Sequence, residues 1–307
     1  MISIVMAAYN GELYIQKQLQ SIYEQTKKPD EVLIYDDCSK DHTVEIIQNF
    51  IKGKEDITWK LHCNEKNVGY IKNFLTAIEE AAGDIIILAD QDDIWLPGKI
   101  ARMEEIMNSV PGILSLHTEI DIIDKDDHIL KHAVLGYQKQ LEQISVSRFC
   151  QKLNYCGMST AFRKEIKSYL NTLDRQELFT HDWTIHAIGV CKEGLYLSNE
   201  VLTQRRYHDS NVALNMDAAV RTGVKQRLGV IHEFLQAYQL LLKISSNTKI
   251  DQSKQKLIKK YIKTTNLRIQ ALKNKSYIQM VKNMVHIRFF PNWKAYICDW
   301  LYLLGIF

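Results

Sequence analysis

The sequence lacks the marks of a secreted, disulfide-stapled or membrane-spanning protein. Its six cysteines show neither close pairing nor the spacing of a zinc site, which favours a reducing compartment. The first residues already have a strand pattern, without the basic segment, apolar segment and cleavage site of a signal peptide. The final apolar run, residues 302–307, is far too short to span a bilayer. These absences together predict a cytoplasmic protein.

Internal repeats, low-complexity segments and recognised nucleic-acid-binding motifs are also missing. With 46% apolar and 24% charged residues, the composition is that of a globular protein. A chain of 307 residues can bury one large core and carry an appendage. We expect no nucleic-acid partner, because no binding motif accompanies the basic residues of the chain.

Alternating strand and helix patterns fill the first third of the chain. Strands are expected at residues 2–8, 31–35, 58–62 and 85–89, and helices at residues 13–22, 44–50 and 70–81. Strand–helix units of this length form a parallel sheet with right-handed crossovers. Ligands of such sheets bind beyond the carboxyl ends of the strands. The pattern therefore predicts an α/β fold with a site at that edge.

Acidic side chains follow the second and fourth of these strands. Asp36 and Asp37 come after one strand, and Asp90 and Asp92 come after the other. Both pairs fall at the same edge of the sheet, so we expect them to converge on one crevice. Residues 90–93 contain three carboxylates, those of Asp90, Asp92 and Asp93, which repel one another. The expected counter-charge is a hard divalent cation that also holds a diphosphate. A solvated turn before the next helix is the alternative.

Polar residues later in the chain are further candidates for a binding or catalytic site. Asp182 either complements the dipole at a helix start or acts as a general base. Arg205 and Arg206 are candidates for binding phosphates, and His208 is a candidate metal ligand, with a solvated loop as the alternative. The acidic run 121–127 is predicted to be a hairpin with a solvated turn.

Ordered motifs within residues 1–212 resemble those of glycosyltransferase family 2. They are Met6–Gly11, Tyr35–Asp41, Asn67–Gly69, Ala89–Trp95, His181–Trp183 and Arg205–Asn211. This combination is similar to the bacterial rhamnosyltransferase-like branch. The resemblance implies a GT-A fold, Rossmann-like with a mostly parallel sheet, that binds a nucleoside diphosphate sugar and inverts the anomeric carbon.

The resemblance also implies roles for single residues. Asp36 and Asp37 would lie near the nucleotide base and Asp90 near the ribose. Asp92 would bind the Mg²⁺ or Mn²⁺ that bridges the diphosphate, and Asp182 matches the catalytic base. The other nucleotide-sugar-binding candidates are Ala8, Tyr9, Asn67, Gly69, Arg205 and Arg206. The family often has Pro in place of Ala8 and Gly in place of Cys38, and Cys disfavours the positive φ that Gly permits.

Two residues are expected in the acceptor region. Gly157 lies among small residues that border the acceptor pocket in the resembled family, although a glycine also relieves crowding in a strand. Trp183 is either a platform that stacks on a sugar or an aromatic residue of the core, and the core is the safer expectation.

Charge divides the chain near residue 216. Residues 1–216 contain 23 Lys plus Arg and 32 Asp plus Glu, whereas residues 217–307 contain 16 Lys plus Arg and 4 Asp plus Glu. At the same place the pattern becomes helical, with helices expected at residues 223–244 and from Asp251 or Ser253 to Lys273 and a turn at residues 245–248. We predict a catalytic GT-A domain at 1–216 and a basic, amphipathic helical extension at 217–307.

The helical extension has the composition of a membrane-surface anchor. Lysines line one side of the helix that ends at Lys273, and Trp293 and Trp300 repeat at helical spacing after it. Such segments suit an anionic membrane surface, so a peripheral position on the inner face of the cell membrane is expected. Packing on the catalytic domain or a homo-oligomer seam is the alternative.

The leading functional hypothesis is an inverting, metal-dependent glycosyltransferase of bacterial surface polysaccharide synthesis. Its donor would be a dTDP- or UDP-sugar, with rhamnose as a candidate, and its acceptor a saccharide or a lipid-linked saccharide. A sugar-phosphate nucleotidyltransferase is the second hypothesis, but the Gly-rich, Arg-containing loop of those enzymes is missing. A receiver-like phospho-switch is the third, and the separated motifs and the helical region count against it.

Overall fold

The computed structural model describes residues 1–153, 155–208, 223–248 and 250–306. The chain forms two compact units: a sheet unit of Met1–Ile144 and Tyr155–His208, and a helical unit of Ser145–Asn154 and Asp209–Phe307. The boundary expected between residues 216 and 217 lies outside the described residues. Residues 145–153, which the sequence assigned to the first domain, group with the helical unit.

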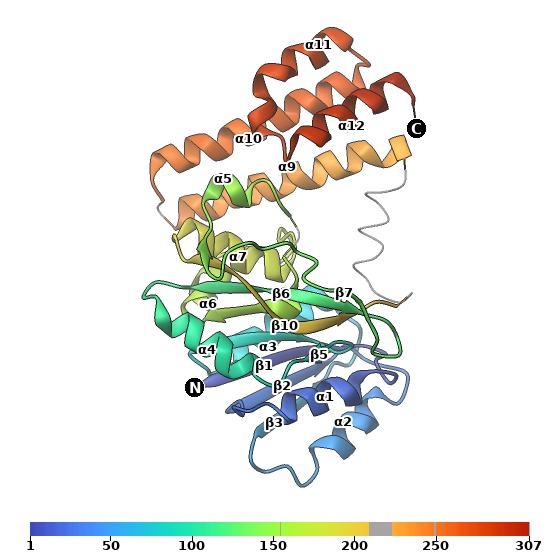
Figure 1. Ribbon diagram of the computed structural model, residues 1–307, viewed down its shortest axis with the longest axis vertical. Coiled ribbons are helices and arrows are strands. Elements are labelled where there is room, and N and C mark those ends of the chain that lie inside the picture. Colours follow the sequence, from blue (N-terminus) through green and yellow to red (C-terminus); the bar gives the residue numbers. More distant parts are fainter. Residues whose placement is uncertain (154, 209–222, 249, 307) are drawn as a thin grey trace. The chain divides into compact units, whose positions relative to one another are not determined.

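Four parallel strands build the first half of the sheet (Figure 1). They are β1 (Ile2–Ala8), β2 (Glu31–Asp36), β3 (Thr58–Cys63) and β4 (Ile85–Asp90), in the order β3-β2-β1-β4. All four match the predicted strands. The register places Asp36 beside Ala8 and Asp90 beside Ala7, so these carboxyl ends lie at one edge.

The second half of the sheet is mixed, but most paired residues of the whole sheet lie in parallel ladders, as predicted. Its strands are β9 (Thr160–Arg163), β6 (Ser115–Ile123), β10 (Leu195–Arg206), β5 (Ile94–Trp95), β7 (Ile129–Lys131) and β8 (Glu142–Gln143). Only β6 and β10 pair in parallel here, among the strands that the structure describes. Because β6 and β7 pair across residues 124–128, the predicted acidic hairpin is confirmed.

Helices cover both faces of this sheet (Figure 1). They are α1 (Ile15–Tyr23), α2 (Thr43–Ile51), α3 (Tyr70–Glu80), α4 (Lys99–Ser109), α6 (Glu165–Leu170) and α7 (His181–Cys191), with a short 3-10 helix η1 (Gly157–Ser159). Alternate residues of β1, including Ile4 and Met6, join one core cluster with Leu19 of α1 and Ile47 of α2. Helix α3 packs against β1 and β2. Burial on both faces explains the continuous apolar runs of these strands.

The helical unit contains α5 (Val146–Phe149), α9 (Gly223–Asn247), α10 (Gln252–Lys273), α11 (Tyr277–Lys282), the 3-10 helix η2 (Asn283–Phe289) and α12 (Trp293–Leu304). The helix predicted to end at Lys273 is confirmed, and Asp251 caps it by accepting from Ser253 N at 3.0 Å. The turn expected at residues 245–248 is wrong, since α9 continues to Asn247. Within the described ranges, no helix combines the length and hydropathy needed to cross a bilayer.

Candidate active site

Polar side chains join the loops that follow β1, β2 and β4. Gln91 pairs reciprocally with Tyr9: Tyr9 N donates to Gln91 Oε1 at 2.8 Å, and Gln91 Nε2 donates to Tyr9 O at 2.9 Å. Asn10 N donates to Ser39 Oγ at 2.9 Å. A Cβ on Gly11 would lie 2.3 Å from Gln91 Oε1, so a larger residue at this position would displace this amide. These bonds hold the three loops together at the carboxyl edge of the sheet.

Asp37 organises the loop before α3. Its oxygens accept from Asn64 Nδ2 at 2.9 Å, Val68 N at 2.8 Å and Gly69 N at 2.9 Å. Gly69 has a φ of 85°, in the region that favours glycine. The carboxylate is only 3% exposed and is therefore occupied mainly with its own chain. Its structural role is to hold the Asn67–Gly69 motif in place.

Asp36 fixes the turn after β2 in a similar way. It accepts from Ser39 N at 2.9 Å and also from the Ser39 hydroxyl. Within this turn Cys38 has a φ of 65°, the conformation that its glycine counterparts adopt without strain. A left-handed conformation at a non-glycine residue costs roughly 1–2 kcal/mol. The turn thus keeps the shape of the family motif in spite of the cysteine.

The two residues predicted as metal ligands lie in contact. His208 Nε2 is 2.9 Å from Asp92 Oδ2, and the two side chains are 14% and 19% exposed. The imidazole ring also lies against Tyr14, with ring centroids 4.9 Å apart. A bound cation would replace the hydrogen bond between Asp92 and His208, because Asp92 Oδ2 and His208 Nε2 would then both be ligands of the cation.

Negative charge accumulates around this pair. Burial, together with the charges of Asp92 and Asp182, raises the pKa of Asp90 to about 7, although the charges of Arg205 and Lys99 oppose the rise. Burial also raises the pKa of Asp93 well above its ordinary range. The site therefore holds more carboxylate charge than its own cations balance, as expected where a cation binds.

The residues present fit a cation shared with a ligand better than a closed metal centre. Among the described residues, no group of three His, Cys, Asp or Glu side chains is arranged to hold a metal. Mg²⁺ is commonly held by one or two carboxylates together with substrate phosphates. Asp92 and His208 supply such an incomplete protein contribution.

Arg206 has a structural role, which corrects its assignment to the phosphates. Its guanidinium is fully buried and donates to the carbonyl oxygens of Asp92 at 2.9 Å and Asp124 at 2.9 Å. It also forms an ion pair with Asp127 at 2.5 Å. The acidic turn of the β6–β7 hairpin is therefore tied to the site instead of being fully solvated. Arg205, the neighbouring residue, is half-buried, and its charge lowers the pKa of Asp90.

Lys99 is a buried cation that the sequence reasoning missed. Its ammonium group donates to Met158 O and to Thr203 Oγ1 at 2.8 Å, and it lies 3.9 Å from the centroid of a Trp95 ring. Burial lowers its pKa well below the ordinary range, whereas the charges of Asp93 and Asp90 oppose that change. Its place on the apolar stripe of α4, four residues before Met103, is the signal that could have revealed it.

Asp182 lies in the first turn of α7, as one of its two predicted roles requires. Thr180 caps α7 by accepting from Trp183 N at 3.2 Å, and Asp182 Oδ1 accepts from the same group at 2.7 Å. The positive end of the helix stabilises negative charge there. The charge of Asp182 raises the pKa of both Asp90 and Tyr70, so α7, β4 and α3 converge at this point. Tyr70 is a further site residue that sequence reasoning missed.

His181 and Gly157 lie next to Asp182. A Cβ on Gly157 would lie 3.2 Å from His181 Nε2 and 3.8 Å from Asp182 Oδ2. His181 stacks on Phe74 with ring centroids 4.1 Å apart, and neither of its ring nitrogens has a hydrogen-bond partner among the described residues. Trp183 is 1% exposed, so it belongs to the core and is no sugar platform.

Hydrogen bonds to His117 hold the loop that carries Gly157. His117 Nε2 accepts from Cys156 N at 2.9 Å and from Ser159 Oγ at 2.8 Å, while Tyr137 contacts His117 Nδ1 at 2.9 Å. Together with the bond from Lys99 to Met158, these contacts fix the approach to Asp182.

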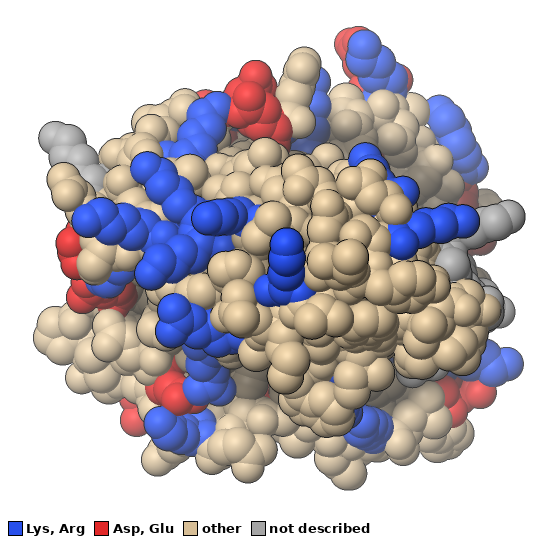
Figure 2. Space-filling model, turned by 90° about the horizontal axis from the view of Figure 1, so that it is seen from above, with Lys and Arg blue, Asp and Glu red and all other residues tan. Residues whose placement is uncertain are grey.

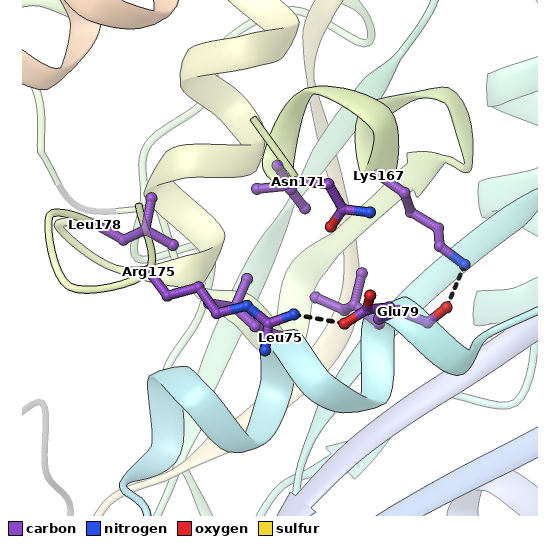
Figure 3. Close-up of a pocket in the computed structure, with 8 residues that line it drawn as sticks. Leu75, Glu79, Lys167, Asn171, Arg175 and Leu178 are labelled. Carbon is purple, nitrogen blue, oxygen red and sulfur yellow. Dashed lines mark hydrogen bonds and ion pairs between the residues drawn. The ribbon is translucent and has the colours of Figure 1, made fainter. Parts of the chain in front are cut away.

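A small pocket elsewhere in the sheet unit does not take part in this arrangement. It lies between α3 and the region of α6, and its walls are Leu75, Ile78, Glu79, Lys167, Leu170, Asn171, Arg175 and Leu178 (Figure 3). Arg175 pairs with Glu79, and Lys167 donates to Glu79 O at 2.8 Å. None of the predicted site residues lines it, and its charged groups bind each other.

Sequence comparison finds a match to the model of glycosyl transferase family 2 over residues 3–170. A dTDP-rhamnosyl transferase, RfbG of Shigella flexneri, is 40% identical over 31% of this chain and 34% of its own length. The UDP-Glc:alpha-D-GlcNAc-diphosphoundecaprenol beta-1,3-glucosyltransferase WfgD of Escherichia coli is 30% identical over 48% of this chain and 57% of its own. These matches thus span between about a third and somewhat over half of the relatives.

Solved structures show the same fold at low sequence identity. Residues 1–349 of S. aureus TarS, in complex with UDP-GlcNAc, match 93% of this chain and 79% of theirs with a TM-score of 0.61 and 15% identity. The mannosyltransferase PcManGT of Pyrobaculum calidifontis, in complex with GDP-Man and Mn²⁺, matches 97% and 86% with a TM-score of 0.54 and 16% identity.

Proposed function

The chain belongs to glycosyltransferase family 2, and from this premise we propose that it transfers a sugar from a nucleoside diphosphate donor with inversion of the anomeric carbon. The observation that carries the proposal is the convergence of Asp182 with Asp90 and Asp92, which come from separate elements of the sheet unit. A transferase needs a base for the acceptor and a countercharge for the leaving group in one crevice. Family membership favours this reaction over nucleotidyl transfer and over a phospho-switch.

In the proposed reaction Asp182 takes the proton of the acceptor hydroxyl. The hydroxyl oxygen forms a bond to the anomeric carbon from the face opposite the nucleotide, and the bond from that carbon to the diphosphate oxygen breaks. The nucleoside diphosphate leaves with the bonding electrons, and the proton stays on the carboxylate. Because Asp182 Oδ1 is engaged by the helix start, Oδ2 is the oxygen that accepts this proton.

A divalent cation, when bound, would neutralise the diphosphate, and Asp92 and His208 are the residues that would hold it. Arg205 supplies a further positive charge at this side of the crevice. The PcManGT complex with GDP-Man and Mn²⁺ supports a cation of this kind in the fold. Asp36 and the Asp37-bound loop 67–69 then shape the nucleotide end of the site.

For donor and acceptor we propose a dTDP- or UDP-sugar and a saccharide or lipid-linked saccharide. The names of RfbG and WfgD, which specify a dTDP-rhamnosyl and a diphosphoundecaprenol-linked reaction, support these classes. Rhamnose is one candidate sugar. Synthesis of a bacterial surface polysaccharide at the inner face of the membrane is the setting that this acceptor class implies.

Nucleotide binding with and without metal tests the proposal. UDP and dTDP should each be tried for thermal stabilisation, with Mg²⁺, Mn²⁺ or chelator, since a ligand of the folded state raises the melting temperature. We expect metal-dependent stabilisation that Asp92→Ala abolishes. Asp126→Ala, which removes an exposed carboxylate from the β6–β7 turn, is the matched control and should bind normally. Stabilisation that is unchanged in Asp92→Ala would remove this residue from the mechanism.

A further inference from the structure

The segment of α11 and η2, residues 277–289, is apolar on more than one side. Met280 and Phe289 point into the helical unit and are 0% and 7% exposed. Ile278, Val281 and Val285, spaced three and four residues apart, are 71%, 57% and 78% exposed. A helix on the surface of a globular protein normally turns a polar face outward. This segment keeps an aliphatic face outside, which requires a partner or a surface of matching chemistry.

Exposed apolar side chains of α12 extend this face. Trp293 is 61% exposed, and Ile297 and Leu304 follow it at helical spacing and are also exposed. The two parts meet where Tyr277 stacks on Trp300, with ring centroids 6.2 Å apart. We call the whole set the apolar face; its members are Tyr277, Ile278, Val281, Met284, Val285, Ile287, Trp293, Ile297 and Leu304.

This location corrects the anchor expected from the sequence. The apolar stripe of α10 lies inside the helical unit, where Ile258, Tyr261 and Leu272 are almost fully buried. Trp300 packs against the core of the same unit, whereas Trp293 stays at the surface. The lysines of α10 therefore lie on the solvent-facing side of a helix whose apolar side is packed. The exposed apolar side chains belong to α11, η2 and α12.

Charge at the surface of residues 252–306 has one sign. The segment contains nine Lys, two Arg and one acidic residue, Asp299. Asp299 is 0% exposed and is bound by Arg268 at 2.7 Å and Arg227 at 2.6 Å. Lysines and arginines around the apolar face are Lys273, Lys275, Lys282, Arg288 and Lys294, all exposed. Figure 2 shows a broad uncharged surface bordered by Lys and Arg, with Asp and Glu toward the edges of the view.

We propose that the apolar face inserts into the interfacial region of an anionic lipid bilayer. Aliphatic and Trp side chains would enter the headgroup boundary, and the surrounding cations would contact lipid phosphates. This inference deepens the proposed function, because a lipid-linked acceptor is presented at such a surface. A symmetric contact between two copies through the same face would oppose cation to cation, so a second copy is the disfavoured occupant.

Vesicle sedimentation without donor or metal tests this assignment independently of transfer. The full chain should bind vesicles of phosphatidylglycerol and phosphatidylcholine, bind pure phosphatidylcholine much more weakly, and dissociate as salt rises. The double variant Ile278→Asp/Val285→Asp should bind anionic vesicles on the order of 100-fold more weakly, because two large apolar contacts are lost and negative charge is added. Both residues are exposed, so the melting temperature should not change.

Leu130→Asp is the matched control, since Leu130 is 58% exposed but lies in β7 of the sheet unit. This variant should bind vesicles like the unaltered chain. The assignment is overturned if the unaltered chain does not bind anionic vesicles at low salt, or if the double variant binds as well as the control. Sedimentation equilibrium showing an oligomer that the double variant dissociates would assign the face to a second copy. Nucleotide stabilisation, measured separately, reports on the proposed function alone.

Discussion

Adjacent arginines at the end of β10 should respond oppositely to the same substitution. Arg206 is buried and donates to the carbonyl oxygens of Asp92 and Asp124, with an ion pair to Asp127. In Arg206→Met these acceptors lose their charged partner while the methionine fills part of the volume. Hydrogen bonds to a charged group contribute about 1.5–3 kcal/mol each, so loss of the two to the carbonyl oxygens should cost about 3–5 kcal/mol in the free energy of unfolding. For a unit of this size that corresponds to a fall in melting temperature of roughly 10 °C.

Arg205→Met should leave the melting temperature within a few degrees of the unaltered protein, because this side chain is only half-buried. It should weaken metal-dependent binding of UDP or dTDP by roughly 10- to 100-fold, as a charge-assisted hydrogen bond contributes about 1.5–3 kcal/mol. Differential scanning fluorimetry with and without nucleotide measures both quantities. If Arg206→Met instead melts normally and loses only nucleotide binding, this side chain faces the ligand and is not structural.

Two further predictions concern a buried carboxylate and the acceptor side. Burial raises the pKa of Glu31, but hydrogen bonds from Ser3, Ala82 N and Lys60 outweigh it, so the pKa lies below its ordinary value of 4.5. The ionised carboxylate therefore stabilises the fold above pH 4.5, and this stabilisation is lost as the pH falls below 4.5. Glu31→Gln should lower the melting temperature at pH 7 and make the melting temperature fall less steeply on acidification. Equal pH profiles of the two proteins would contradict this. Gly157→Ala should slow transfer about ten-fold or more while nucleotide stabilisation is unchanged, because the new methyl group crowds His181 and occupies space next to Asp182. A loss of nucleotide binding would place Gly157 elsewhere.

The parallel half of the sheet was predictable because its signal is local. Each of β1 to β4 is a short apolar run followed by helical periodicity, and the carboxyl ends of parallel neighbours must share an edge. The antiparallel insertion of β9 between β4 and β6 depends on pairing between distant segments. The two-residue strands β5 and β8 are too short to show any period. These pairings are tertiary, so no pattern in the sequence could assign them.

Within the site, residue types were easier to predict than the direction in which side chains point. Asp92 and His208, the two residues predicted to hold a metal, lie in contact. Arg205 and Arg206 were indistinguishable, although alternation along a strand requires neighbours to face opposite sides. Trp293 and Trp300 likewise share helical spacing but differ in burial, because Trp300 packs against the core of the helical unit. Sequence spacing gives the face of an element, and the neighbouring elements decide which face is buried.

The most direct test of the central claim is transfer by Asp182→Asn. This variant keeps the size of the side chain and a polar contact at the start of α7, but it cannot accept the acceptor proton. We expect unchanged metal-dependent nucleotide binding and transfer slower by roughly 100-fold or more in this variant. The product of the unaltered enzyme should have an inverted anomeric configuration. Asp174→Asn, an exposed carboxylate before α7, is the matched control and should transfer normally. Near-normal turnover in Asp182→Asn, or a product with retained configuration, would contradict the account.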